Sequence, residues 1–100
     1  MKRLSVTRTS QAEEDLIDIW TYVAQDNPTA ADRLLDRIDA RLTQLSLLPA
    51  SGPPRDDLPA GTRHLVIGNL LAFYRVEEDG IVVLRVMHGR RNIAADDIAT

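Results

Sequence analysis

The chain has 100 residues, which fits one domain over residues 1–100, and 44% of them are hydrophobic, enough to bury a core. A formal net charge of −3 argues against a protein that binds nucleic acid over its whole surface, and the absence of cysteine excludes disulfides and thiolate metal sites. No apolar run approaches the ~20 residues of a membrane span and no secretory signal is visible, so we expect a cytoplasmic protein without a membrane partner.

The N-terminal half begins with a predicted strand and helix. Lys2–Thr7 alternates in polarity, which indicates a short strand. Ser10 is the predicted N-cap of a helix that ends near Gln25, with Glu13 at the capping-box position. The apolar stripe of this helix contains Ala12, Leu16, Ile19, Trp20 and Val23, so Trp20 is expected in the core.

A second helix follows after a very short break. Asn27 is its predicted cap, Pro28 suits its first position, and Pro49 ends it. Its apolar stripe contains Ala31, Leu34, Leu35, Ile38, Leu42 and Leu45. So short a connection makes the two helices antiparallel neighbours.

The C-terminal half predicts a loop and three strands. Ala50–Gly61 is rich in proline and glycine and is expected to be irregular. Strands are predicted over Thr62–Ile67, Leu70–Val76 and Ile81–His88, and residues 92–100 are expected to form a short helix. The predicted fold is α+β, a two-helix hairpin packed on a small antiparallel sheet in the order strand-helix-helix-strand-strand-strand, with the first strand antiparallel to the last.

Sorting the strand residues by alternation gives two faces that are both mostly apolar. One set is His64, Val66, Leu70, Ala72, Tyr74, Val76, Val82, Leu84, Val86 and His88; the other is Arg63, Leu65, Ile67, Leu71, Phe73, Arg75, Ile81, Val83, Arg85 and Met87. Two helices cover only one face, so we expect a partner segment, acidic and apolar, on the arginine-bearing second face. The alternative is that bulges or the proline-rich loop change the register and cover the excess.

Stretches along nearly the whole chain resemble the RelE/ParE toxin superfamily, and most closely its ParE branch. They are Asp15–Tyr22, Asn27-Pro28 with Ala30 and Ala31, Leu48-Pro49, Gly52, Arg55, Gly61–Arg63, Gly68, Phe73–Val76 and Leu84–Arg91. The resemblance implies a bacterial type II toxin–antitoxin system with a cognate ParD-like antitoxin. The C-terminal segment of such an antitoxin wraps the toxin, and its N-terminal part binds operator DNA, so this chain would meet operator DNA only through the antitoxin.

The superfamily contains two main activities, of which the sequence favours one. RelE-like members cleave mRNA in the ribosome with cationic residues and a general acid or base, whereas ParE-like members are not enzymes and poison DNA gyrase. Here Lys2 is the sole lysine, and the last strand is followed by Gly89 and not by an aromatic residue. Alternation also places His88 on one face of the sheet and the three arginines on the other, so they would not converge on one phosphate. We therefore expect a gyrase inhibitor without catalytic residues, metal or cofactor. The alternatives are an mRNA endonuclease and a detoxified relative that keeps antitoxin binding.

Two surfaces are assigned to partners. The predicted antitoxin-binding residues are Leu71, Phe73, Arg75, Val83, Arg85, Met87 and Arg63 on the sheet, with Arg33 and Arg37 from a basic row on the second helix. In the alternative interpretation, the basic row is only part of a solvated helix face that carries both charges. Arg90 and Arg91 are assigned to the surface that meets gyrase or its DNA, or else they only solubilise the chain. Arg85→Glu is expected to weaken antitoxin binding.

Overall fold

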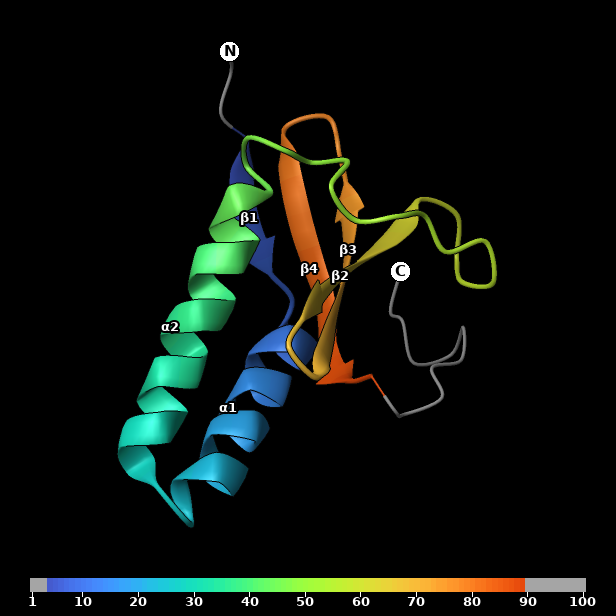
Figure 1. The fold of residues 1–100 in the computed structure, drawn as a ribbon. Helices are drawn as coiled ribbons and strands as arrows, with labels where there is room; N and C mark the ends of the chain where they lie inside the picture. Colours follow the sequence, from blue (N-terminus) through green and yellow to red (C-terminus); the bar gives the residue numbers. More distant parts are fainter. Residues whose placement is uncertain (1–3, 90–100) are drawn as a thin grey trace.

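The computed structural model describes residues 4–89, which form a four-stranded sheet covered on one face by two helices (Figure 1). In chain order the elements are β1 (Ser5–Arg8), α1 (Ser10–Ala24), α2 (Pro28–Gln44), β2 (Thr62–Ile67), β3 (Leu70–Val76) and β4 (Gly80–His88). The strands lie in the order β1-β4-β3-β2. The predicted α+β class and the order of elements are confirmed. No helix within residues 4–89 combines the length and the apolar character that a membrane crossing requires.

The direction of β1 differs from the prediction. β1 pairs with β4 in parallel, with Ser5 opposite Gly80 and Arg8 opposite Val83, so the sheet is mixed and the predicted antiparallel pairing is wrong. Only Thr9 separates β1 from α1, and one residue is too short a connection to reverse the chain. Figure 1 shows α1 continuing in roughly the direction of β1.

Thr9 also fixes the start of α1. Its Oγ1 accepts a hydrogen bond from the backbone N of Ala12 at 3.1 Å, so Thr9 is the N-cap and Ser10, the predicted cap, is the first helical residue. The Thr9 hydroxyl donates in turn to the backbone O of Leu84 at 2.9 Å. The cap therefore ties the first turn of α1 to β4.

The start of α2 agrees with the prediction, and its end does not. The side-chain oxygen of Asn27 accepts from a backbone amide three residues further on at 3.1 Å, and Pro28 occupies the first helical position. α2 ends at Gln44, before the predicted end at Pro49. The residues between form turns closed by backbone hydrogen bonds, most of them to the residue three positions back.

The register of the strands mixes the two residue sets that alternation had separated. The turn at Gly68-Asn69 places Ile67 opposite Leu70, so an odd-numbered residue of β2 shares its face with an even-numbered residue of β3. Between β3 and β4 the register shifts at Phe73 and Tyr74, which changes the relation once more. The predicted faces are therefore wrong in detail.

The helix-side face of the sheet carries the main core. Its buried strand residues are Leu65, Ile67, Leu70, Ala72, Tyr74, Ile81, Val83 and Val86. They pack with Ala12, Leu16 and Ile19 of α1, with Ile38 and Leu42 of α2, and with Leu45. Leu4 and Val6 pack at the edge of this core, so the apolar stripes of both helices and of β1 point inward as predicted.

The opposite face carries a smaller buried cluster made of Phe73, Leu84, Met87 and Leu58. Leu58 comes from the loop of residues 45–61, and the guanidinium carbon of Arg55 lies 5.6 Å from the centre of the Phe73 ring. The expectation that the chain itself leaves this face uncovered is therefore wrong for these side chains. The alternative, in which the proline-rich loop covers them, is confirmed for this cluster. Val66, in contrast, is 53% exposed.

Tyr74 anchors the loop of residues 45–61 to the sheet. Its buried hydroxyl donates to the backbone O of Pro49 at 2.8 Å and accepts from the backbone N of Gly52 at 2.9 Å. An isolated bridge between Pro54 and Arg63 continues this attachment along β2. The loop thus occupies part of the sheet edge that β2 would otherwise leave unpaired.

Candidate functional site

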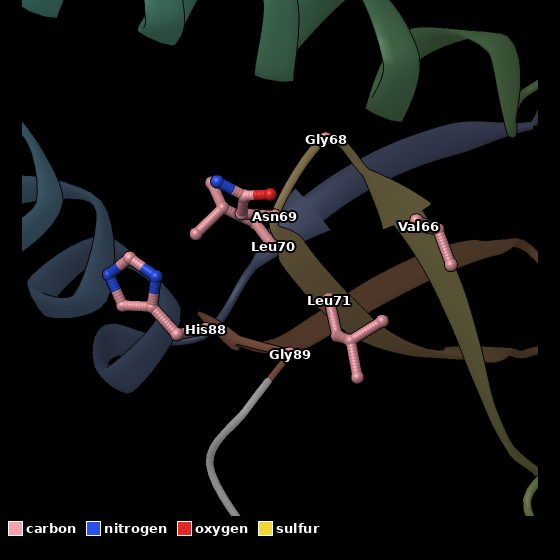
Figure 2. A pocket seen from close by; sticks show the side chains of 7 residues that line it. All are labelled: Val66, Gly68, Asn69, Leu70, Leu71, His88 and Gly89. Carbon is pink, nitrogen blue, oxygen red and sulfur yellow. The ribbon is translucent and has the colours of Figure 1, made fainter.

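Three adjoining hollows surround His88 at the end of β4, and we call them together the His88 groove. Their volumes are about 480, 420 and 170 Å³. The first is lined by Val66, Gly68, Asn69, Leu70, Leu71, His88 and Gly89 (Figure 2). The second adds Ile19, Tyr22, Val23, Leu34, Arg37 and Ile67, and the third adds Asp15, Asp18, Val86 and Met87.

The turn between β2 and β3 shapes this groove. Gly68 has a φ of +59°, a left-handed conformation that favours glycine, and the backbone N of Gly89 donates to the O of Asn69 at 2.8 Å. A Cβ atom at Gly68 would lie 3.4 Å from Nη2 of Arg37, so the guanidinium from α2 borders the turn. The groove therefore has walls from both helices and from the ends of three strands.

The groove combines apolar surface with a few polar groups. Figure 2 shows the side chains of His88 and Asn69 near the start of β3, with those of Leu71 and Val66 further along the strands. Tyr22 lies on its helical rim and is 70% exposed. An open, mostly apolar depression with scattered polar groups fits a polypeptide segment. Residues 4–89 contain no group of three or more potential metal-ligating side chains.

His88 pairs with Leu70 across the strands, and because Leu70 belongs to the helix-side core, His88 also lies on the helix-side face. The guanidinium of Arg85 also lies on that side, where it meets Asp15 of α1, so the predicted separation of His88 from Arg85 is wrong. Arg75 pairs with Val82 across the strands, and both side chains lie on the face that points away from the helices. The register shift within β4 is the cause, because strict alternation fails there.

The residues predicted to bind the antitoxin do not lie together. Leu71, Met87 and Arg37 line the His88 groove. Phe73 and Val83 are 1% and 0% exposed and belong to the clusters on opposite faces of the sheet. The structure therefore brings Leu71 and Arg37 to one surface, whereas Met87, at 5% exposure, is buried beneath it, and Phe73 and Val83 are inaccessible within the protein.

Two of the predicted arginines are held by neighbouring groups. Nη1 of Arg63 donates to the backbone O of Gly52 at 2.7 Å, and Nη2 of Arg75 donates to Oε1 of Glu77 at 2.9 Å. Arg63 thereby helps to fix the loop of residues 45–61. This hydrogen bond indicates a structural role for Arg63, which the spacing of residues in the sequence did not predict.

The remaining predicted cations lie on α2 or near the C-terminus. Arg33 is exposed on α2, one turn before Arg37. Arg90 and Arg91 lie outside the described residues, as does the helix expected over residues 92–100. The structure thus leaves Arg33 and Arg37 as the cationic side of α2 beside the His88 groove.

Arg85 forms the most buried ion pair of residues 4–89. Its Nε and Nη2 donate to the two carboxylate oxygens of Asp15 at 2.7 and 2.9 Å, and the backbone N of Val86 donates to Asp15 at 3.0 Å. The two side chains are 14% and 13% exposed. A glutamate at position 85 would face Asp15, so Arg85→Glu is expected to disrupt the fold before it reports on antitoxin binding.

A second polar cluster lies over Phe73 on the opposite face of the sheet. Arg55 forms a bidentate ion pair with Asp57, with hydrogen bonds of 2.8 and 2.7 Å, and this bond lowers the pKa of Asp57. The ring of His64 lies 6.5 Å from that of Phe73. Burial, and then the charge of Arg55, lower the pKa of His64, and its Nδ1 is buried without a hydrogen-bond partner in the described part of the chain.

The lowered pKa of His64 predicts a pH-dependent stability. Below about pH 6.5 the unfolded chain takes up this proton more readily than the folded one, so the free energy of unfolding should fall as pH decreases from 6.5 toward the folded pKa. Urea unfolding at several pH values between about 7.5 and 5.5 measures the slope. His64→Gln should flatten it, and parallel slopes for the two proteins would show that another group is responsible.

Comparison with known proteins gives a consistent result. Residues 6–93 match the family model of the ParE toxin of the type II toxin–antitoxin system parDE. Toxin ParE3 of Caulobacter vibrioides is 33% identical over 91 residues, covering 90% of this chain and 91% of the relative. Toxin ParE1 of the same organism is 34% identical over 97 residues, covering 95% of this chain and 97% of the relative.

Solved structures share the fold. The chromosomal ParDE toxin–antitoxin system from P. aeruginosa contains a chain that matches with a TM-score of 0.73 at 25% identity, over 86% of this chain and 96% of that one. The RelBE2 toxin–antitoxin complex from Mycobacterium tuberculosis matches with a TM-score of 0.62 at 24% identity, over 88% and 99% of the two chains. The second likeness concerns the fold alone.

Proposed function

Because the chain belongs to the ParE toxin family of type II toxin–antitoxin systems, we propose that it inhibits DNA gyrase in the cytoplasm and that a ParD-like antitoxin encoded beside it neutralises it. The observation that carries this proposal is the match of the ParE family model over residues 6–93. The net charge of −3 supports contact with operator DNA only through the antitoxin.

The contacts of the arginines in the sheet favour a toxin that binds a protein over a toxin that cleaves RNA. A nuclease needs cations directed at the scissile phosphate and at the charge that develops there. Arg63, Arg75 and Arg85 each donate to a group of the chain itself, namely a backbone carbonyl or a carboxylate. Their engagement favours a toxin that acts by occupying a protein surface.

The His88 groove is the proposed seat of the antitoxin segment. Val66 and Leu71 provide partly exposed apolar surface on one side of it, and Arg37 provides a cation at the β2–β3 turn. Arg33 extends the positive charge by one turn of α2. A segment with apolar side chains and flanking carboxylates would match this surface.

Paired activity assays test the proposed target. The purified chain is expected to inhibit supercoiling by gyrase and to increase cleaved DNA, and the co-encoded antitoxin should abolish both effects. In parallel, ribosomes translating a defined mRNA should show no cleavage. Ribosome-dependent cleavage without any effect on gyrase would replace this proposal with the nuclease alternative, and inactivity in both assays would indicate a detoxified relative.

A charge placed in the groove is expected to weaken antitoxin binding. Val66→Glu adds an acidic group to an exposed apolar position, so affinity for the co-encoded antitoxin should fall about tenfold or more while the fold persists. Titration calorimetry measures this change. Val76→Glu is the matched control, because Val76 is also exposed, at 39%, but lies at the far end of β3. Equal losses in both variants would remove the groove from the interface.

A further inference from the structure

Three arginines, Arg33, Arg37 and Arg41, follow one side of α2 at intervals of four residues, and we call them the arginine row. Their side chains form no ion pair and no hydrogen bond within residues 4–89. The other arginines of that range each hold a carboxylate or a backbone carbonyl; they are Arg8, Arg55, Arg63, Arg75 and Arg85. The arginine row is therefore the part of the described surface where cationic groups are left for a ligand.

The carboxylates of α2 lie on a different side of the helix. Asp32 accepts a hydrogen bond from the tryptophan of α1 at 2.8 Å. Asp39 accepts one from Arg8 at 3.3 Å, and Asp36 follows the same side, because it is four and three residues from the other two. Arg37 instead borders the β2–β3 turn through its Nη2. α2 thus separates its charges, so the net charge of −3 does not exclude a local cationic surface.

The arginine row is regular and lies on a rigid support. A helix rises about 1.5 Å per residue, so neighbouring arginines start about 6 Å apart and the whole row covers about 12 Å. None of the large exposed apolar side chains of residues 4–89 lies on α2. A docked polypeptide usually depends on an apolar anchor, so this row is better suited to a ligand that is held by charge.

Arg41 carries an unsatisfied donor at the end of the row. Its Nε is buried and has no hydrogen-bond partner within residues 4–89. A buried donor without an acceptor is unfavourable, and a charged one more so. An anionic oxygen bound at the row would supply the acceptor that the described part of the chain lacks.

We propose that the arginine row binds the phosphate backbone of duplex DNA. A duplex carries one negative charge per about 1.7 Å of its axis, so a length of about 12 Å offers a phosphate to each of the three guanidinium groups. Guanidinium groups bind phosphate oxygens through paired hydrogen bonds, and contacts of this kind position a protein without reading the base sequence. The proposed ligand is therefore duplex DNA of any sequence.

This inference deepens the proposed inhibition of gyrase and rests on it for its role in the cell, because gyrase acts on duplex DNA. The row would hold the toxin to the DNA at its target, which is a different contact from the recognition of operator DNA by the antitoxin. Arg37 and Arg33 also lie beside the His88 groove. A duplex and the antitoxin segment would therefore compete for the same cations.

Fluorescence anisotropy of a labelled duplex of about 16 base pairs tests the inference on the full chain without antitoxin. Binding at low salt should be saturable, and two duplexes of unrelated sequence should bind within about twofold of each other. Three phosphate contacts predict a slope of about −2.7 when the logarithm of the association constant is plotted against the logarithm of salt concentration. A glutamate-rich peptide of the same charge should bind at least about tenfold more weakly than the duplex.

Matched variants locate the binding. Arg37→Gln should weaken the duplex about tenfold at low salt and reduce the size of the slope by about one. Arg75→Gln is its control, because it removes the same charge from the face of the sheet that points away from the helices, and it should stay within about twofold.

A gain of affinity separates the role of the row from any loss of folding. Gln44→Arg extends the row at an exposed position three residues beyond Arg41, so it should strengthen duplex binding and increase the slope by about one. Thr43→Arg adds the same charge at the neighbouring exposed position, one turn after Asp39 on the carboxylate side, and should have less than about half of that effect.

Absence of duplex binding, or equal effects of the variants and their controls, would overturn the inference. Equal affinity for the glutamate-rich peptide would assign the row to an acidic polypeptide and would also overturn it. A supercoiling assay in parallel keeps the two proposals apart. Gyrase inhibition by a chain that does not bind the duplex refutes this inference alone, and duplex binding by a chain that leaves gyrase active refutes the proposed function alone.

Discussion

Asp15→Ala is expected to lower the free energy of unfolding by about 3–5 kcal/mol, because it removes the carboxylate that accepts hydrogen bonds from a mostly buried guanidinium and from a backbone amide. Arg85 loses both of its hydrogen bonds to the carboxylate, and Val86 loses the bond from its backbone N. Domains of this size are stable by only about 5–15 kcal/mol. The melting temperature should therefore fall by roughly 15–30 °C, as followed by circular dichroism.

Asp18→Ala is the control for that measurement. Asp18 is exposed on the same helix, so its removal should change stability by no more than about 0.5 kcal/mol. If Asp15→Ala proved as mild as Asp18→Ala, the ion pair would contribute little to the attachment of α1 to β4. That result would also restore Arg85→Glu as a clean probe of antitoxin binding.

Gly52→Ala is expected to detach the loop of residues 45–61 from the sheet. A Cβ at Gly52 would collide with the backbone O of His64 and lie 2.9 Å from the hydroxyl of Tyr74, so one of the packed segments must shift. Overpacking against backbone costs about 1–3 kcal/mol or more, and displacement also breaks the hydrogen bond between Tyr74 and Gly52. Urea unfolding measures the loss.

Ser51→Ala provides the comparison at the preceding, exposed position, where the change should cost at most about 0.5 kcal/mol. Amide exchange in Gly52→Ala should also accelerate along the outer edge of β2, where the loop pairs with Arg63. A variant as stable as the parent protein, with unchanged exchange, would contradict the close approach of this loop to the sheet.

Local signals predicted most elements of the fold. Asn27 and Pro28 marked the start of α2, and Gly68-Asn69 marked the β2–β3 turn, because caps and turns depend on residues close in sequence. The direction of β1 and the faces of the sheet depended instead on the one-residue connection at Thr9 and on the register shift beside Phe73. Neither has a signature in composition or periodicity.

The candidate site was less predictable than the fold. Asp15 stands among the acidic residues at the start of α1, where the helix dipole already explains a carboxylate, so nothing pointed to a partner seventy residues away in the sequence. Val83 and Arg85 look like surface residues only when the strand is read without its bulge. Family resemblance supplied the partner, and only the three-dimensional arrangement supplied the accessible groove.

The position of β4 has a consequence for how the protein folds. β4 is the last strand within residues 4–89, yet β1, α1 and β3 all pack directly against it. The earlier segments therefore lack their central support until residues 80–88 have left the ribosome. We expect the nascent toxin to remain without stable structure throughout synthesis and to fold in one step after release, as pairings between distant parts of a chain require.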